Sequence, residues 1–127
     1  MFVGVCRVHL FLPENDSLKG KRAVVKSLLE RTRARFNVAA AEVGLLDEHE
    51  RAELAFVVVS NEAKHANTML SKISEFCEEH AEAEIGGIHV ELVPMGKPVG
   101  DPMVPREDWG LPESWRGEPS SRRDKPE

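Results

Sequence analysis

Apolar or small residues occupy every second position at the start of the chain. The residues at these even positions are Phe2, Gly4, Cys6, Val8, Leu10 and Leu12. The residues between them are mixed in polarity. A period of two is typical of a β-strand that buries one face, so we predict a first strand that ends before Pro13.

The pattern then changes to the spacing of an amphipathic helix. Ser17 follows the turn at residues 13–16 and is a suitable N-cap residue. Apolar or small residues recur on one side of a 3.6-residue helix after it. They are Leu18, Val25, Leu28, Leu29, Thr32 and Phe36. We predict the first helix here.

Two strands, a second helix and a last strand follow. Residues 37–46 and 53–60 predict a hairpin around residues 47–50, and Ser60 or Asn61 can cap the second helix. The residues at helical spacing in that helix are Ala66, Met69, Leu70, Ile73, Phe76 and Cys77. From about residue 85, Ile88, Val90 and Leu92 alternate with His89, Glu91 and Val93, as expected for a strand.

The order strand, helix, strand, strand, helix, strand predicts an α+β, ferredoxin-like βαββαβ fold. In this fold four antiparallel strands take the order 4-1-3-2 and both helices cover one face. We assign residues 1–94 to this domain. Seven of the eight prolines lie in residues 94–127, so residues 95–127 are expected to form a flexible tail.

Charge is distributed unevenly along this chain of net charge −5. Residues 17–37 hold seven Lys or Arg and one acid, whereas residues 38–93 hold three bases and twelve acids. On a helical wheel, Lys19, Arg22, Lys26 and Arg33 form one flank of the first helix, and Arg31 and Arg35 lie on the other.

The basic segment has three candidate explanations. We predict contact with nucleic-acid phosphates through Lys19, Lys21, Arg22, Lys26 and Arg33, because a solvated helix normally mixes charges of both signs. An acidic protein, or the glutamates of the second helix, could supply the anions instead. A plain solvated face is the third possibility.

The sheet face without helices is a second candidate surface. Arg7, His9, His89 and Glu91 are expected to point outward there, among apolar residues. An exposed apolar face favours homodimerisation or a protein partner. Binding of single-stranded RNA is less favoured, because the only aromatic residue on this face is Phe11 and the chain has no Tyr.

The tail contains both tryptophans, Trp109 and Trp115. They could fold back onto the domain, or they could anchor a short motif in the pocket of a partner. A third possibility is that they do little.

We identify no pattern typical of an enzyme, a cofactor site, a metal centre or a small-molecule substrate site. A metal would require His9, His89 and Glu91 to converge. The two cysteines, Cys6 and Cys77, lie in apolar patterns and are expected to be buried and reduced. The N-terminal apolar run is too short to span a bilayer, so we expect no membrane association and a cytoplasmic location.

Residues 1 to about 93 resemble the YlxP-like family of small bacterial proteins of unknown function. The resemblance rests on "SLKGKR" at the start of the first helix, "RFNV" at its end, and "VVSN" before the second helix. It implies a ferredoxin-like fold. Family genes often neighbour those of transcription, translation-initiation and ribosome-maturation factors, which implies a role near RNA or a ribosomal particle.

Gly20 departs from this family pattern, in which Glu is usual. A Glu at this position could form a reciprocal capping box with Ser17. Glycine removes that bond and costs about 1 kcal/mol of helix propensity relative to Ala. The sequence therefore predicts a first turn that frays.

Taken together, the basic segment and the family resemblance predict a non-enzymatic accessory protein that contacts structured RNA.

Overall fold

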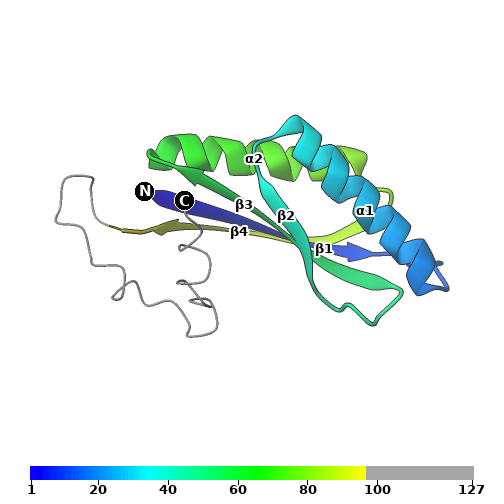
Figure 1. The fold of residues 1–127 in the computed structure, drawn as a ribbon. Helices are drawn as coiled ribbons and strands as arrows, with labels where there is room; N and C mark the ends of the chain where they lie inside the picture. The colour runs from blue at the N-terminus through cyan, green and yellow to red at the C-terminus, as the bar shows by residue number, and fades with distance from the viewer. Residues whose placement is uncertain (97–127) are drawn as a thin grey trace, which may run out of the picture. The chain divides into compact units, whose positions relative to one another are not determined.

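The computed structural model describes residues 1–96 and contains one four-stranded antiparallel sheet with two helices (Figure 1). The elements are β1 (Phe2–Phe11), α1 (Leu18–Arg35), β2 (Ala39–Gly44), β3 (Arg51–Ser60), α2 (Ala63–His80) and β4 (Glu84–Pro94). The strand order is β2-β3-β1-β4, which confirms the predicted order 4-1-3-2 read in reverse. Met1–Lys97 forms one compact unit.

Both helices lie on the same face of the sheet, and the core fills the space between them and the strands (Figure 1). The even residues of β1 and β3 point into this core and the odd residues point away, as the period of two predicted. The largest buried apolar side chains include Leu10, Leu28, Phe56, Leu70 and Ile73. The apolar stripes of the helices thus determine which face of the sheet is covered.

The two helices begin in different ways. Ser17 is the N-cap of α1, as predicted, and its Oγ accepts a hydrogen bond of 3.0 Å from the Gly20 amide. The predicted cap of α2 is wrong by one or two residues, because Glu62 is its N-cap and makes no side-chain cap bond. Ser60 Oγ accepts a hydrogen bond from the Glu62 amide before the helix begins, so it stabilises the turn that precedes the helix.

Two glycines adapt the central strand β1 to its neighbours. A Cβ on Gly4 would lie 2.8 Å from Leu70 Cδ1, so the missing side chain lets α2 approach the strand closely. At the other end, the pairing of β1 with β4 shifts between His9 and Leu10. Partners there change from Gly87 to Ile85, which places Gly86 in a bulge.

Candidate functional site

One side of α1 carries a row of exposed cations, which we call the cationic flank. It consists of Lys19, Arg22, Lys26 and Arg33. Arg33 Nη2 donates a hydrogen bond of 2.6 Å to the carbonyl of Ala40 in β2. The cationic flank therefore lies on the side of α1 that faces the edge strand β2.

The glutamates of α2 do not neutralise this flank. Arg31, on the opposite side of α1, donates to the carbonyl of His80 at the end of α2, so α2 lies on the other side of the helix. Within residues 1–96 the ion pairs are Arg7–Glu53, Lys21–Glu42 and Arg51–Glu48. None of them uses a residue of the cationic flank, so the intramolecular alternative fails for the described residues.

Lys21 does not belong to the exposed cations that the sequence predicted to contact phosphates. Its side chain is fully buried, and Nζ donates to the carbonyls of Leu45, Arg51 and Leu46 at 2.8, 3.2 and 3.4 Å. Glu42 Oε2 lies 2.9 Å from the same nitrogen. Lys21 thus links α1 to the β2–β3 connection by hydrogen bonds, and its ammonium group cannot reach an external phosphate.

The helical wheel already contained a signal for this burial. Lys21 is four residues before Val25 and seven before Leu28, which are both core residues. These spacings place it on the buried face. A lysine within an apolar stripe has to find acceptors in the interior, because an unpaired buried charge is costly.

Asn15 explains why glycine is present at position 20. The Asn15 side-chain amide donates to the carbonyls of Ser17 and His49, at 2.7 and 2.5 Å. A Cβ on Gly20 would collide with Asn15 Oδ1. Asn15 therefore links the start of α1 to the β2–β3 connection through these two hydrogen bonds.

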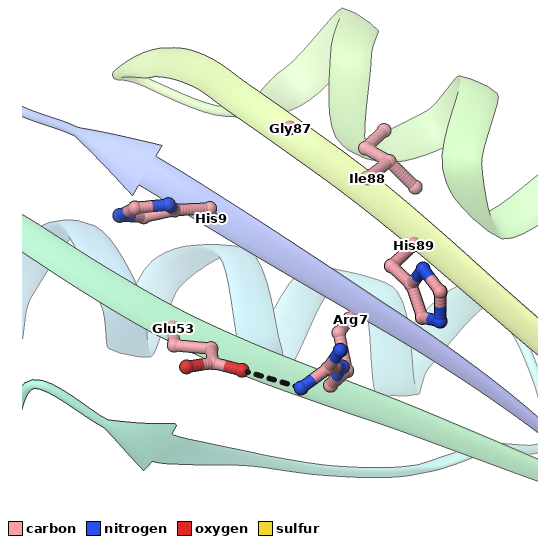
Figure 2. A pocket seen from close by; sticks show the side chains of 6 residues that line it. All are labelled: Arg7, His9, Glu53, Gly87, Ile88 and His89. Carbon is pink, nitrogen blue, oxygen red and sulfur yellow. Dashed lines mark hydrogen bonds and ion pairs between the residues drawn. The ribbon is translucent and has the colours of Figure 1, made fainter.

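The open face of the sheet carries the predicted polar group (Figure 2). Arg7 Nη1 lies 3.3 Å from Glu53 Oε2, and His9 and His89 lie on either side of this pair. The side chains surround a shallow hollow of about 280 Å³, whose lining includes Gly87 and Ile88. A Cβ on Gly87 would meet nothing within 4 Å, so the glycine leaves this space open.

The two histidines do not face each other across strands, contrary to the possibility raised by the sequence. His9 pairs with Gly87, and His89 pairs with Arg7, while Glu91 pairs with Val5. In the part of the chain that the structure describes, no three His, Cys, Asp or Glu side chains are close enough to bind a metal ion together. The hollow therefore offers polar contacts but no metal-binding geometry.

Both cysteines are buried and free, as the sequence predicted. Burial raises the pKa of the Cys6 thiol, and a hydrogen bond with Ser74 opposes this shift. Burial also raises the pKa of Cys77, to about 12, and negative charge at Cys6 and Glu78 adds to the effect. Neither thiol is activated as a nucleophile, because the reactive form is the thiolate.

Two further predictions concern the tail and membranes. Trp109 and Trp115 lie outside the described residues, as does nearly all of the segment 95–127. Neither α1 nor α2 has a stretch of sufficient length and hydropathy to cross a lipid bilayer.

Sequence comparison places the domain in a known family. The model of a family described as "protein of unknown function (DUF503)" matches residues 3–90, which is more than half of the chain. The chain belongs to the DUF503 family. Over 82 residues it is 29% identical to the uncharacterized protein YlxP of Bacillus subtilis (strain 168), covering 65% of this chain and 89% of that protein. The YlxP-like resemblance is thereby confirmed.

Two of the solved structures that resemble this fold are a designed protein and a crystal structure named as an enzyme. A de novo designed protein with a ferredoxin fold has a TM-score of 0.48 and 16% identity, covering 82% of this chain and 92% of the design. A crystal structure named as an antibiotic biosynthesis monooxygenase has a TM-score of 0.42 and 12% identity, covering 76% of this chain and all of that one.

Proposed function

We propose that this protein is an accessory factor that contacts the phosphates of structured RNA, such as the RNA of a ribosomal particle, through the cationic flank of α1. The observation that carries the proposal is the absence of any carboxylate partner for this flank within residues 1–96. The contact that we propose is electrostatic and needs no catalytic group or cofactor.

The geometry of the flank suits a row of phosphates. From Lys19 to Arg33 the helix rises by about 21 Å, at 1.5 Å for each residue. The first turn of α1 contains no acid, so the positive end of the helix dipole adds to the charges of Lys19 and Arg22. Anions are therefore attracted most strongly near the start of the helix.

Structured RNA fits this surface better than unpaired bases do. Recognition of single strands relies on aromatic side chains that stack on bases, whereas duplex RNA is held mainly by shape and by backbone contacts. The cationic flank contains no aromatic residue, and Phe11 lies on the open face of the sheet. Although the overall net charge is −5, a local cationic surface of this kind can attract a polyanion.

A salt titration of RNA binding tests the proposal. The double variant Arg22→Glu/Lys26→Glu reverses two cations of the flank, and Lys64→Glu/Lys72→Glu makes the same charge change on exposed positions of α2. We expect the α1 variant to lose at least tenfold in affinity for an RNA hairpin, measured by fluorescence anisotropy, and the α2 variant to bind nearly as wild type. Equal losses in both variants would show that only net charge matters.

A second experiment addresses the identity of the RNA. The tagged full-length chain is mixed with ribosomal particles at low and at high salt, with and without ribonuclease, and bound material is recovered. We expect the recovery of ribosomal particles to fall at high salt and after ribonuclease treatment. The α1 variant should recover little even at low salt. Recovery that survives ribonuclease and charge reversal would instead indicate a protein partner and would remove the RNA proposal.

The second candidate function is a protein-interaction module that uses the open face of the sheet. The partly exposed valines of that face favour it, since apolar patches of this kind often mark interfaces. Its most specific form is a contact between two copies of the chain.

A further inference from the structure

A continuous apolar patch covers half of the open face of the sheet. It consists of Val3, Val5, Val57, Val59 and Val93, which we call the valine patch. The strand register makes these residues direct neighbours, because Val3 pairs with both Val59 and Val93, and Val5 pairs with Val57. Val59 is 61% exposed. Neither helix covers this patch, since both lie on the other face (Figure 1).

The other half of the open face is polar but close to neutral. It contains Arg7 and Glu53, together with His9 and His89, whereas Glu91 lies beside the valine patch, opposite Val5. Arg7 and Glu53 already form a pair. A surface with this charge attracts no polyanion, but it can approach an identical surface without strong repulsion.

We propose that a second copy of this chain covers the open face, with the valine patches of the two copies in contact. In a two-fold dimer the same surface meets itself, so it has to be complementary to its own charges. The open face meets this condition because it combines acids, bases and an apolar half. A partner with a large net charge would gain little from so neutral a surface.

The available area is also sufficient for a stable dimer. Four strands about 4.8 Å apart, with β1 and β3 about 33 Å long, present a face of roughly 600 Å² before side-chain relief is included. Specific interfaces bury about 800 Å² on each partner. With roughly 600 Å² on each copy, the whole open face lies at the lower end of the size range of specific interfaces, and side-chain relief adds to this area.

The dimer is compatible with the proposed RNA contact but does not depend on it. Both copies of α1 lie on the outer faces of such a dimer, because the helices cover the opposite side of each sheet. Each dimer then presents two cationic flanks that point away from each other. Loss of RNA binding would leave the dimer proposal standing, and a monomer could still bind RNA.

Sedimentation analysis of the full-length chain tests the proposal. We expect a dimer with a dissociation constant of about 1 µM, and a rise of roughly 30-fold in the dissociation constant of the variant Val59→Lys, because the new charge would be buried in the contact. Leu46→Lys is the matched control, since Leu46 is 55% exposed in the β2–β3 turn and should leave the dimer intact. A wild-type monomer at about 100 µM, or equal effects of both variants, would overturn the proposal.

A charge exchange provides a second test that does not depend on an apolar substitution. Arg7→Glu makes the open face acidic and should weaken the dimer, whereas Arg7→Glu/Glu53→Arg restores both the local pair and neutrality. We expect the double variant to regain most of the lost affinity. Dimerisation that is insensitive to Arg7→Glu would place the contact elsewhere.

A chain shortened to residues 1–96 separates the domain from the segment that follows it. The compact unit Met1–Lys97 contains the core described above, so the shortened chain should fold. We expect it to dimerise as the full-length chain does. A dimer that forms only after shortening would mean that the removed segment covers the face, and a dimer lost on shortening would assign the contact to that segment. Either result would overturn the proposal.

Discussion

Lys21 and Glu42 form an ion pair in the interior, with Nζ 2.9 Å from Oε2 and side-chain exposures of 1% and 16%. The ammonium group has three protons, and three backbone carbonyls accept them. Glu42 Oε2 is buried and has no hydrogen-bonding neighbour other than this ammonium group. The carboxylate thus balances the charge of Lys21, while the carbonyls of the β2–β3 region satisfy its protons.

We predict that Lys21→Met lowers the free energy of unfolding by about 3–5 kcal/mol, because it leaves the Glu42 charge and three carbonyls without a partner. Lys19→Met is the matched control on the exposed side and should change stability by less than about 0.5 kcal/mol. Urea unfolding measures both. Addition of Glu42→Leu to Lys21→Met should recover part of the loss, and strictly additive effects would contradict the pair.

Helix propensity alone predicts that Gly20→Ala stabilises α1 by about 1 kcal/mol. The structure predicts the opposite sign, because the new Cβ displaces the Asn15 side chain from its bonds to Ser17 and His49. We expect a loss of about 1 kcal/mol, measured by thermal or urea unfolding. In an Asn15→Ala background the same substitution should become stabilising. A stabilising Gly20→Ala in the wild-type chain would rule out this role of Asn15.

The buried thiol of Cys77 predicts a dependence of stability on pH. Its pKa rises from 9.0 to about 12 on folding, so above pH 9 the unfolded state loses this proton while the folded state keeps it. The stabilisation from this thiol is fully present below pH 9. Between pH 9 and about pH 12 its loss lowers the free energy of unfolding by about 1.4 kcal/mol for each pH unit. Urea unfolding under reducing conditions at pH 8 to 10.5 measures the decline.

Cys77→Ala is the control for that decline. Its cavity lowers stability at every pH, but the slope above pH 9 should become shallower by the contribution of one thiol. An unchanged slope would mean that other groups, such as the lysines, produce the whole effect. Alkylation of the native protein should also be slow, because both thiols are buried.

The RNA contact predicts a defined salt dependence. The slope of log affinity against log salt falls by about 0.7–0.9 for every phosphate contact removed. Arg22→Gln/Lys26→Gln should therefore reduce the slope by about 1.4–1.8 units, whereas Lys64→Gln/Lys72→Gln should leave it unchanged. A reduced affinity with the same slope would indicate that Arg22 and Lys26 do not contact phosphates.

The sequence was sufficient for the architecture. The period of two in Phe2–Phe11 identified both the strand and its buried face, and the helical spacing of Ala66, Leu70 and Ile73 identified the stripe of α2. These patterns are reliable because each element has to bury one face, and the position of every residue within a strand or helix decides on which face it lies. The strand order followed from the handedness of the βαβ units.

The candidate surfaces were only partly predictable. Periodicity placed Lys19, Arg22 and Lys26 on an exposed flank, but it could not show whether an acid from another element lay beside them. That depended on which side of α1 the helix α2 occupies, and the bonds of Arg33 and Arg31 decided it. The spacing of Lys21 from Val25 and Leu28 indicated the buried face, but its acceptors lie 24 to 30 positions further along the chain and could not be identified from the sequence.

By itself, the sequence determined the order of the elements, the faces that they bury and the positive charge of α1, because these properties depend on residues close together in the chain. Only the tertiary structure decided which acceptors Lys21 meets in the interior, that a Cβ at position 20 would collide with the Asn15 side chain, and that the valines of β1, β3 and β4 form one patch. Each of these results depends on groups that are far apart in sequence and that meet only when the sheet forms.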